Sequence, residues 1–95
     1  MKIIYSPEAI YDLQRLRDFI EINNPIAAKV ISKRLLEGIE KLKTFPRMGI
    51  EVNKASDPDL IRDLILGIYT VRYLLEEKHI YILRIWHQKE DEIDS

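Results

Sequence analysis

Hydrophobic and polar positions alternate in steps of two along the stretch 62–87. The clearest part follows Gly67, where one set of side chains is Tyr69, Val71 and Tyr73 and the other is Thr70, Arg72 and Leu74. Alternation of this kind, rich in aromatic and β-branched residues, predicts strands. Gly67 and the charged run 76–79 interrupt the pattern, so the stretch predicts three strands joined by two tight turns. Because short turns connect antiparallel neighbours, the three strands should form a meander.

The first half of the chain has hydrophobic residues at helical spacing, three and four residues apart. Ser6 before Pro7 has the features of a helix start, and Asn24 before Pro25 repeats them. The two apolar stripes are Ala9, Leu13, Leu16 and Ile20, and then Ala28, Ile31, Leu35, Ile39 and Leu42. The pattern predicts an antiparallel hairpin of two helices, the second ending near residues 44–46. Three polar residues lie off the first stripe: Asp12, Arg15 and Asp18.

The apolar stripes of the two helices need a cover, and one face of the sheet is the natural one. A short apolar run at residues 2–5 predicts a first strand, which we expect beside the last strand. The expected fold class is α+β, in the order β-α-α-β-β-β, with the helix hairpin packed on one face of a small, mainly antiparallel sheet. Residues 46–58 read as a loop, in which Ile50 and Val52 offer a short extended piece.

The composition fits one globular domain spanning residues 1–95, because 46% of the side chains are hydrophobic and 33% are charged. No cysteine is present, which excludes disulfides and thiolate metal sites. The net charge is −1, although residues 1–54 carry ten Lys and Arg against seven Asp and Glu. A protein that binds nucleic acid through a global field is more basic, so we expect no direct binding to nucleic acid.

The N-terminal residues and the lengths of the apolar runs predict a cytoplasmic protein without a membrane segment. Residues 1–8 lack a signal-peptide pattern, and no apolar run is long enough to span a bilayer. The tail, 88–95, is expected to fray or to form one helical turn. Its acidic residues are Glu90, Asp91, Glu92 and Asp94.

Three arginines lie inside the predicted strands, where a purely structural sheet favours apolar or small polar residues. They are Arg62, Arg72 and Arg84. Because guanidinium groups bind carboxylate and phosphate groups bidentately, one face of the sheet is a candidate working surface. The alternative is that these arginines form surface ion pairs with Asp63, Glu76 or Glu90, which contribute little stability.

The histidines and the strand aromatics each allow a structural interpretation beside a functional one. His87 is a candidate general base or anion contact, or else a hydrogen-bonding cap of the sheet. His79 falls in the charged turn and is expected to be solvated. The aromatic residues form either a stacking platform or ordinary sheet packing; they are Tyr69, Tyr73, Tyr81 and Trp86. Since there is no metal-ligand spacing and no phosphate-binding glycine loop, no metal or cofactor is expected.

Several short motifs, in order along the chain, resemble one known family. They are Tyr5-Ser6-Pro7-Glu8-Ala9 followed by Asp12-Leu13, Pro25-x-Ala27-Ala28, Leu42-x-x-Phe45-Pro46-x-x-Gly49, Arg62-x-Leu64-x-x-Gly67-x-Tyr69-x-Val71-x-Tyr73, and Ile80-x-Ile82-x-Arg84-Ile85-Trp86-His87. In this order and spacing they resemble the RelE/ParE superfamily of toxins from bacterial type II toxin–antitoxin systems. Within it, the chain is most similar to the ParE-like, plasmid-stabilisation branch.

The resemblance implies a small cytoplasmic toxin that is silenced by a cognate antitoxin encoded beside it. ParE-like toxins poison DNA gyrase, whereas RelE-like toxins cut mRNA in the ribosomal A site. Both act from the same scaffold, so the fold alone does not separate them. The antitoxin of such systems has a segment that folds onto the toxin, and we expect this segment to wrap the helix hairpin and reach toward Arg72 and Arg84.

Departures from the family pattern favour the gyrase-directed branch. Thr70 stands where cleaving toxins often have an arginine, and residues 88–91 lack the usual terminal tyrosine. Glu90, in contrast, departs from the ParE-like pattern itself, because many ParE-like chains have an arginine at this position, and it counts against strong inhibition of gyrase. We therefore expect a toxin that binds DNA gyrase rather than an enzyme. The alternatives are a ribosome-dependent mRNA endoribonuclease and a non-toxic protein that only completes an antitoxin complex.

The two mechanisms implied by the resemblance use overlapping residues. A binding toxin would contact its target or its antitoxin through Arg62, Arg72, Tyr73, Arg84, Trp86 and His87. A cleaving toxin would hold the phosphate with Arg62 and Arg84 and move the proton with His87 or Lys89.

Overall fold

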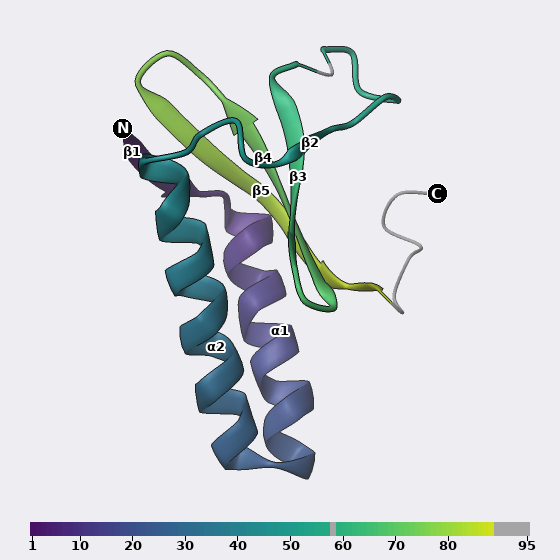
Figure 1. The fold of residues 1–95 in the computed structure, drawn as a ribbon. Coiled ribbons are helices and arrows are strands. Elements are labelled where there is room, and N and C mark those ends of the chain that lie inside the picture. Colours follow the sequence, from purple (N-terminus) through teal and green to yellow (C-terminus); the bar gives the residue numbers. More distant parts are fainter. Residues whose placement is uncertain (58, 89–95) are drawn as a thin grey trace.

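The computed structural model describes residues 1–57 and 59–88. The elements follow in the order β1 (Lys2–Tyr5), α1 (Pro7–Asn23), α2 (Pro25–Glu40), the 3-10 turn η1 (Lys41–Lys43), β2 (Ile50–Glu51), β3 (Ile61–Leu66), β4 (Tyr69–Leu75) and β5 (His79–His87). Figure 1 shows the two helices side by side as one layer, with the sheet as the second layer and the link between the helices projecting beyond it. The predicted α+β class and helix hairpin are confirmed.

The five strands lie in the order β1-β5-β4-β3-β2. The three predicted strands form an antiparallel meander from β3 to β5, and β2 adds a short antiparallel edge. β1 pairs with β5 in parallel, from Lys2 opposite His79 to Tyr5 opposite Ile82. The expectation that the first strand lies beside the last is therefore confirmed. The parallel pair needs a long connection, which the rest of the chain supplies.

Strand register decides which side chains face the helices. In β5 a bulge shifts the pairing, since Arg72 lies opposite Arg84 whereas Tyr73 lies opposite Ile82. Ile82 and Ile85 therefore both face the helices although they are three residues apart. The buried inward-facing residues of the two central strands are Tyr69, Val71, Tyr73, Leu75, Ile80, Ile82 and Ile85.

Both helices begin where the capping residues predict. The Ser6 hydroxyl accepts the backbone N–H of Ala9 at 3.0 Å and donates to the carbonyl of Leu83 at 2.9 Å. This one side chain caps α1 and also fixes the start of the helix against β5. At the start of α2, the Asn24 side chain accepts the N–H of Ala27 at 3.1 Å.

Some element ends differ from the predicted ones. α2 ends at Glu40, and η1 continues the helical backbone in a tighter form as far as Lys43. Pro46 then disfavours helical geometry at Phe45, so the helical backbone does not extend into the loop. His79 is the first residue of β5 rather than part of the turn. Inside the predicted loop 46–58, β2 pairs with β3, so the expected extended piece is present.

Candidate functional site

The arginines of β4 and β5 lie directly opposite each other in the sheet. Arg72 donates through Nε and Nη2 to the two carboxylate oxygens of Asp63 on β3, at 2.8 and 2.9 Å. Its guanidinium carbon also lies 5.1 Å from the ring centre of Trp86, in cation–π geometry. Two like charges placed opposite each other repel, and the carboxylate beside Arg72 offsets this repulsion.

A buried aspartate from α1 binds the second of these arginines. Arg84 donates to Asp12 through Nε at 2.8 Å and through Nη2 at 3.1 Å, and Asp12 is 0% exposed. The same carboxylate accepts the backbone N–H of Ile85 at 2.9 Å. β1 pairs with β5 only as far as Ile82, so this N–H lies on a stretch of the β5 edge that β1 does not cover. Asp12 therefore satisfies an open sheet edge as well as Arg84.

The burial of Asp12 differs from what the apolar spacing of α1 predicts. Helical spacing records which side chains are apolar, and it contains no information about where β1 stops and leaves an edge donor exposed. The family motif, which includes Asp12, is the sequence signal that points to it. Burial alone raises the pKa of this carboxyl, but hydrogen bonds from Arg84 and from the N–H of Ile85 outweigh burial and hold the pKa below its usual value.

The third predicted arginine, Arg62, holds the loop that precedes β3. It pairs with Tyr73 in register and is 8% exposed. It donates to the carbonyl of Gly49 at 2.8 Å, to the carbonyl of Asp59 at 2.9 Å and to the Asp59 carboxylate at 3.1 Å. Register places it on the face of the sheet opposite Arg72, so the structure does not bring the three arginines together on one surface.

Tyr73 is fully buried and holds the same loop. Its hydroxyl donates to the carbonyl of Pro46 at 2.7 Å and accepts the N–H of Gly49 at 3.0 Å. Gly49 permits this approach, because a Cβ there would lie 2.7 Å from the Tyr73 ring. Burial raises the pKa of the Tyr73 hydroxyl. As a predicted partner contact, Tyr73 therefore presents no accessible surface in the free chain.

The remaining predicted residues do not gather around the arginines. Register places His87 opposite Tyr69, and the two rings meet edge to face with their centres 5.4 Å apart. This is the helix-facing side of the sheet, whereas Arg84 belongs to the other side. Trp86 shares the face of Arg72 and is 6% exposed. Lys89, the second candidate for proton transfer, lies outside the described residues.

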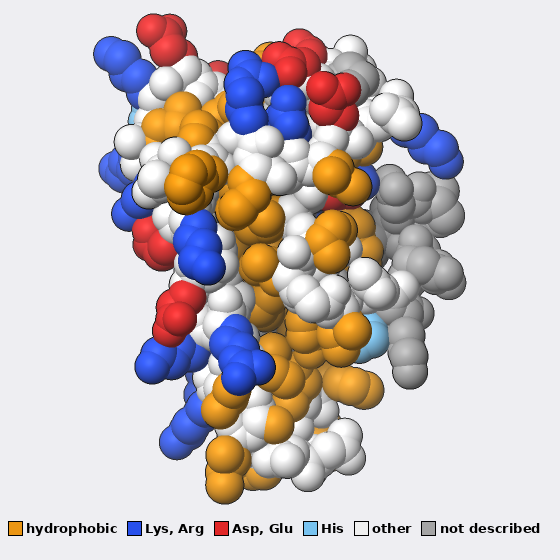
Figure 2. Space-filling model, in the orientation of Figure 1, with side chains coloured by type: hydrophobic (Ala, Val, Ile, Leu, Met, Phe, Trp, Pro, Cys, Tyr) orange, Lys and Arg blue, Asp and Glu red, His pale blue; other side chains and the backbone are white. Residues whose placement is uncertain are grey.

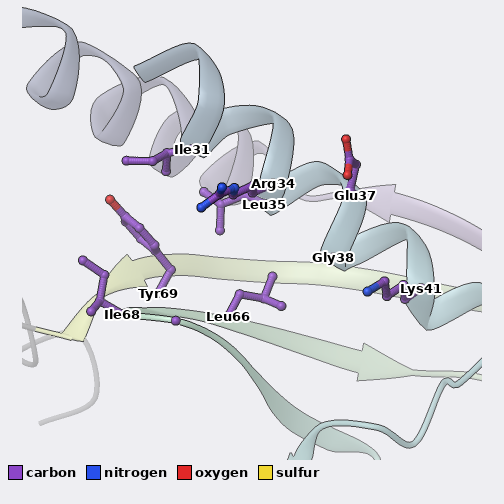
Figure 3. A pocket seen from close by; sticks show the side chains of 10 residues that line it. Ile31, Arg34, Leu35, Glu37, Gly38, Lys41, Leu66, Ile68 and Tyr69 are labelled. Carbon is purple, nitrogen blue, oxygen red and sulfur yellow. The ribbon is translucent and has the colours of Figure 1, made fainter. Parts of the chain in front are cut away.

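A groove that the sequence analysis did not predict lies between α2 and the turn from β3 to β4, and its volume is about 530 Å³. Figure 3 shows Ile31 and Leu35 reaching from the helix toward Tyr69 and Leu66 on the strands. Gly38 allows this close approach, because a Cβ there would lie 2.7 Å from Leu66 Cδ1. A glycine inside a predicted helix is the sequence signal that could have indicated the groove.

The described part of the chain contains no group of three or more His, Asp or Glu side chains that could hold a metal ion. Within residues 1–57 and 59–88, neither helix is long and apolar enough to cross a membrane. The chemistry of the described surface is therefore that of its ion pairs, its exposed apolar residues and the groove.

Comparison with known families decides what kind of protein carries these features. Residues 3–92 match the family described as "ParE toxin of type II toxin-antitoxin system, parDE". The chain belongs to this toxin family. The resemblance drawn from the sequence motifs is confirmed, and membership implies a cognate antitoxin as partner.

Two further comparisons concern a related sequence and a similar fold. The chain is 26% identical over 86 residues to Toxin RelE2 of Caulobacter vibrioides, a match that covers 90% of this chain and 93% of the relative. A solved structure described as "Chromosomal ParDE TA system from P. aeruginosa" has a TM-score of 0.76 and 22% sequence identity, over 92% of this chain and 95% of that chain. At this identity the structural match supports the fold.

Proposed function

We propose that this ParE-family toxin acts in the cytoplasm by binding and poisoning DNA gyrase, and that its cognate antitoxin neutralises it. One observation carries the proposal: both arginines of the outward sheet face are held by carboxylates of the same chain. A guanidinium bound through two nitrogens to a carboxylate must give up that partner before it can bind a phosphate. The arrangement therefore weighs against phosphate binding by these two arginines and so against cleavage, although the same ion pairs also fit the structural alternative given for them in the sequence analysis.

The composition of the outward sheet face supports binding to a protein. Three cross-strand rows can be traced in the register: Asp63, Arg72 and Arg84; Ile61, Leu74 and Tyr81; and Ile65, Thr70 and Trp86. Arg and Tyr are among the residue types that most often anchor protein interfaces, and Arg72 and Tyr81 are partly exposed on this face, whereas Trp86 is 6% exposed and offers little contact area. Ile65 is exposed and lies at the end of this face nearest the turn from β3 to β4.

The alternative is ribosome-dependent mRNA cleavage, which the name of the relative Toxin RelE2 keeps open. Cleavage needs cations on the phosphate and an acid–base group within reach of the same site. Here Arg62 is buried under the loop that precedes β3. His87 lies on the helix-facing side of the sheet, whereas Arg84 lies on the opposite side. This separation supports the gyrase proposal over the nuclease.

A supercoiling assay with purified DNA gyrase tests the proposal. Folded toxin at micromolar concentration is expected to inhibit supercoiling, and addition of antitoxin is expected to restore it. Absence of inhibition by toxin that is folded by circular dichroism contradicts the proposal.

A parallel assay in a translating extract separates the alternatives. Codon-specific breaks in mRNA, together with no effect on gyrase, indicate the nuclease. If the breaks disappear when Arg84→Ala and His87→Ala are combined, those residues belong to its mechanism. Harmless expression without antitoxin, together with a stable antitoxin complex, indicates a non-toxic partner that only completes the complex.

A further inference from the structure

A row of charged side chains crosses the outward face of the sheet and continues onto α1. In spatial order, this arginine row consists of Asp63, Arg72, Arg84, Asp12 and Arg15. Asp63 binds Arg72 at 2.8 Å. Asp12 binds Arg84 at 2.8 Å and Arg15 at 3.5 Å. The side chains of Arg84 and Arg15 are 40% and 32% exposed, so a charged group can reach the row from solvent.

The centre of the arginine row places two positive charges side by side. Arg72 and Arg84 lie directly opposite each other in the strand register, and their carboxylate partners lie at the outer sides of the pair. Because like charges opposite each other repel, a further carboxylate above the pair would stabilise it. Such a carboxylate needs only one hydrogen bond from each guanidinium, which has five N–H donors. The whole row has three guanidinium groups against two carboxylates, which gives a net charge of +1.

The chain itself carries an acidic segment that begins next to this face. β5 ends at His87, and the N–H of Gln88 donates to the carbonyl of Ile68 at 2.8 Å. This hydrogen bond fixes the start of the following segment beside the β3–β4 turn. Residues 89–95 lie outside the described part of the chain, and their sequence has four Asp and Glu against one Lys, a net charge of −3.

The acidic segment is long enough to reach the arginine row. Arg84 precedes Gln88 by four residues, which is about 13 Å along a strand. Residues 89–95 span at most about 24 Å when extended. After a reversal of direction over two residues, carboxylates within 91–94 can therefore lie above Arg72 and Arg84. Because the segment is tethered, its effective concentration at the row is on the order of millimolar, and individually weak ion pairs suffice to hold it.

A second group of cations competes for the same carboxylates on the helix layer. Figure 2 shows Lys and Arg side chains gathered along one side of the hydrophobic strip that runs down this face of the molecule. The groove beside α2 includes two cations, Arg34 and Lys41, which are seven residues or roughly 10 Å apart along the helix. Isolated exposed charges attract a carboxylate weakly, whereas Arg72 and Arg84 can act on one carboxylate together. The arrangement of charges therefore favours the arginine row.

We infer that the acidic segment 90–94 folds back over the outward sheet face and docks its carboxylates on the arginine row. The docked segment masks the surface that contacts the target, a consequence that rests on the proposed function. The target must displace the segment before it can contact Arg72. A toxin whose segment is neutral is therefore a stronger inhibitor than the wild type.

The test uses the single tryptophan and the absence of cysteine in the chain. A nitroxide label is attached at Ser95→Cys, and the broadening of the one indole N–H signal, that of Trp86, is measured by NMR against the reduced label. Trp86 shares the outward face with Arg72. The neutral-segment variant is Glu90→Gln/Asp91→Asn/Glu92→Gln/Asp94→Asn. The control makes the same change in net charge at exposed residues elsewhere: Glu21→Gln/Glu37→Gln/Glu76→Gln/Glu77→Gln.

We expect at least about twofold stronger broadening of the Trp86 signal in the wild-type segment than in the neutral segment, and a loss of this difference at about 0.5 M salt, because salt screens exposed ion pairs. The row variant Arg15→Gln/Arg72→Gln should reduce the broadening, whereas the groove variant Arg34→Gln/Lys41→Gln should leave it unchanged. In the supercoiling assay the neutral-segment variant should inhibit gyrase at a several-fold lower concentration than wild type, and the control at the same concentration. Circular dichroism melts establish that each variant is folded.

The outcomes that overturn the inference can be told apart. Equal broadening with the acidic and the neutral segment means that the segment does not dock through its charges, whatever happens to gyrase. Loss of broadening in the groove variant instead of the row variant places the segment on the helix layer. If the segment docks but its neutral form inhibits gyrase less, the segment contributes to target binding and does not mask it. If it docks and no variant inhibits gyrase, the proposed function fails and the masking role fails with it, while docking on the row stands.

Discussion

Asp12 is the side chain through which three parts of the molecule meet. It comes from α1, binds the guanidinium of Arg84 and accepts the Ile85 N–H at the uncovered edge of β5. A buried carboxylate is tolerated only where donors satisfy it, and here they include a charged group. The aspartate thus has a structural role that does not require it to contact a target.

Replacing Asp12 with asparagine should destabilise the fold by about 2–3 kcal/mol, because a buried acceptor is lost and Arg84 loses its counter-charge. The side-chain amide of asparagine would also place an N–H donor next to the donors of Arg84 and of the Ile85 backbone. Urea unfolding measures the change. Asp18→Asn on the exposed face of the same helix is the matched control and should change stability by less than about 0.5 kcal/mol. Equal effects of the two substitutions would contradict the role given to Asp12.

The pH dependence of stability gives a second prediction for the same residue. The pKa of Asp12 in the folded chain lies below its ordinary value of 3.8. A carboxyl with a lowered folded-state pKa stabilises the fold above its unfolded pKa and loses this contribution as the pH falls through the folded value. The stability difference between wild type and Asp12→Asn should therefore be full above about pH 5 and shrink below about pH 4. A stability difference between wild type and Asp12→Asn that stays constant from pH 7 to pH 3 would contradict the role given to the ionised Asp12 carboxylate.

At the scale of elements, the sequence predicts most of what local chemistry controls. Ser6 and Asn24 begin the helices as their side chains indicate, and the alternation after Gly67 marks the strands. What the sequence does not predict depends on contacts between distant elements. The edge that Asp12 satisfies exists because β1 ends early, and the groove exists because α2 passes close to the β3–β4 turn.

The candidate site shows the same limit. Strand arginines are visible in the sequence, but their partners are not. Asp63, one of the ion-pair partners predicted for them, binds Arg72, whereas Arg84 pairs with Asp12, a partner from α1 that the strand pattern does not indicate. The positions of Arg62 and Tyr73 follow from a loop that folds back over the end of the sheet, which no periodic pattern encodes.

The loop before β3 provides a test at the scale of one element. Tyr73→Phe keeps the ring and removes the hydroxyl that holds Pro46 and Gly49. We expect a loss of about 1–3 kcal/mol in unfolding free energy, because the buried N–H of Gly49 and the partly buried carbonyl of Pro46 lose their partner. Hydrogen exchange at the Gly49 amide should become faster, while the amide of Val71 in the central strand should change only in line with global stability. Tyr81→Phe, in the neighbouring strand, serves as the control for loss of a hydroxyl.

The whole molecule presents two candidate binding surfaces on different layers. The groove beside α2 lies between the helix layer and the sheet, and the arginine-bearing face lies on the side of the sheet that the helices do not cover (Figure 1). A toxin that must be recognised by both a target and an antitoxin can use the two surfaces separately. Substitutions on one surface should then affect one partner more than the other.

The outward sheet face can be tested by separating the guanidinium of Arg72 from its ion pair. Arg72→Gln removes the guanidinium, whereas Asp63→Asn removes the carboxylate charge and leaves the guanidinium in place. If the target contacts the guanidinium, Arg72→Gln should weaken gyrase inhibition roughly tenfold, because anchoring arginines dominate many protein interfaces. Asp63→Asn should change the inhibition much less. Equal loss of inhibition in both would mean that the ion pair supports the sheet and that the target is bound elsewhere.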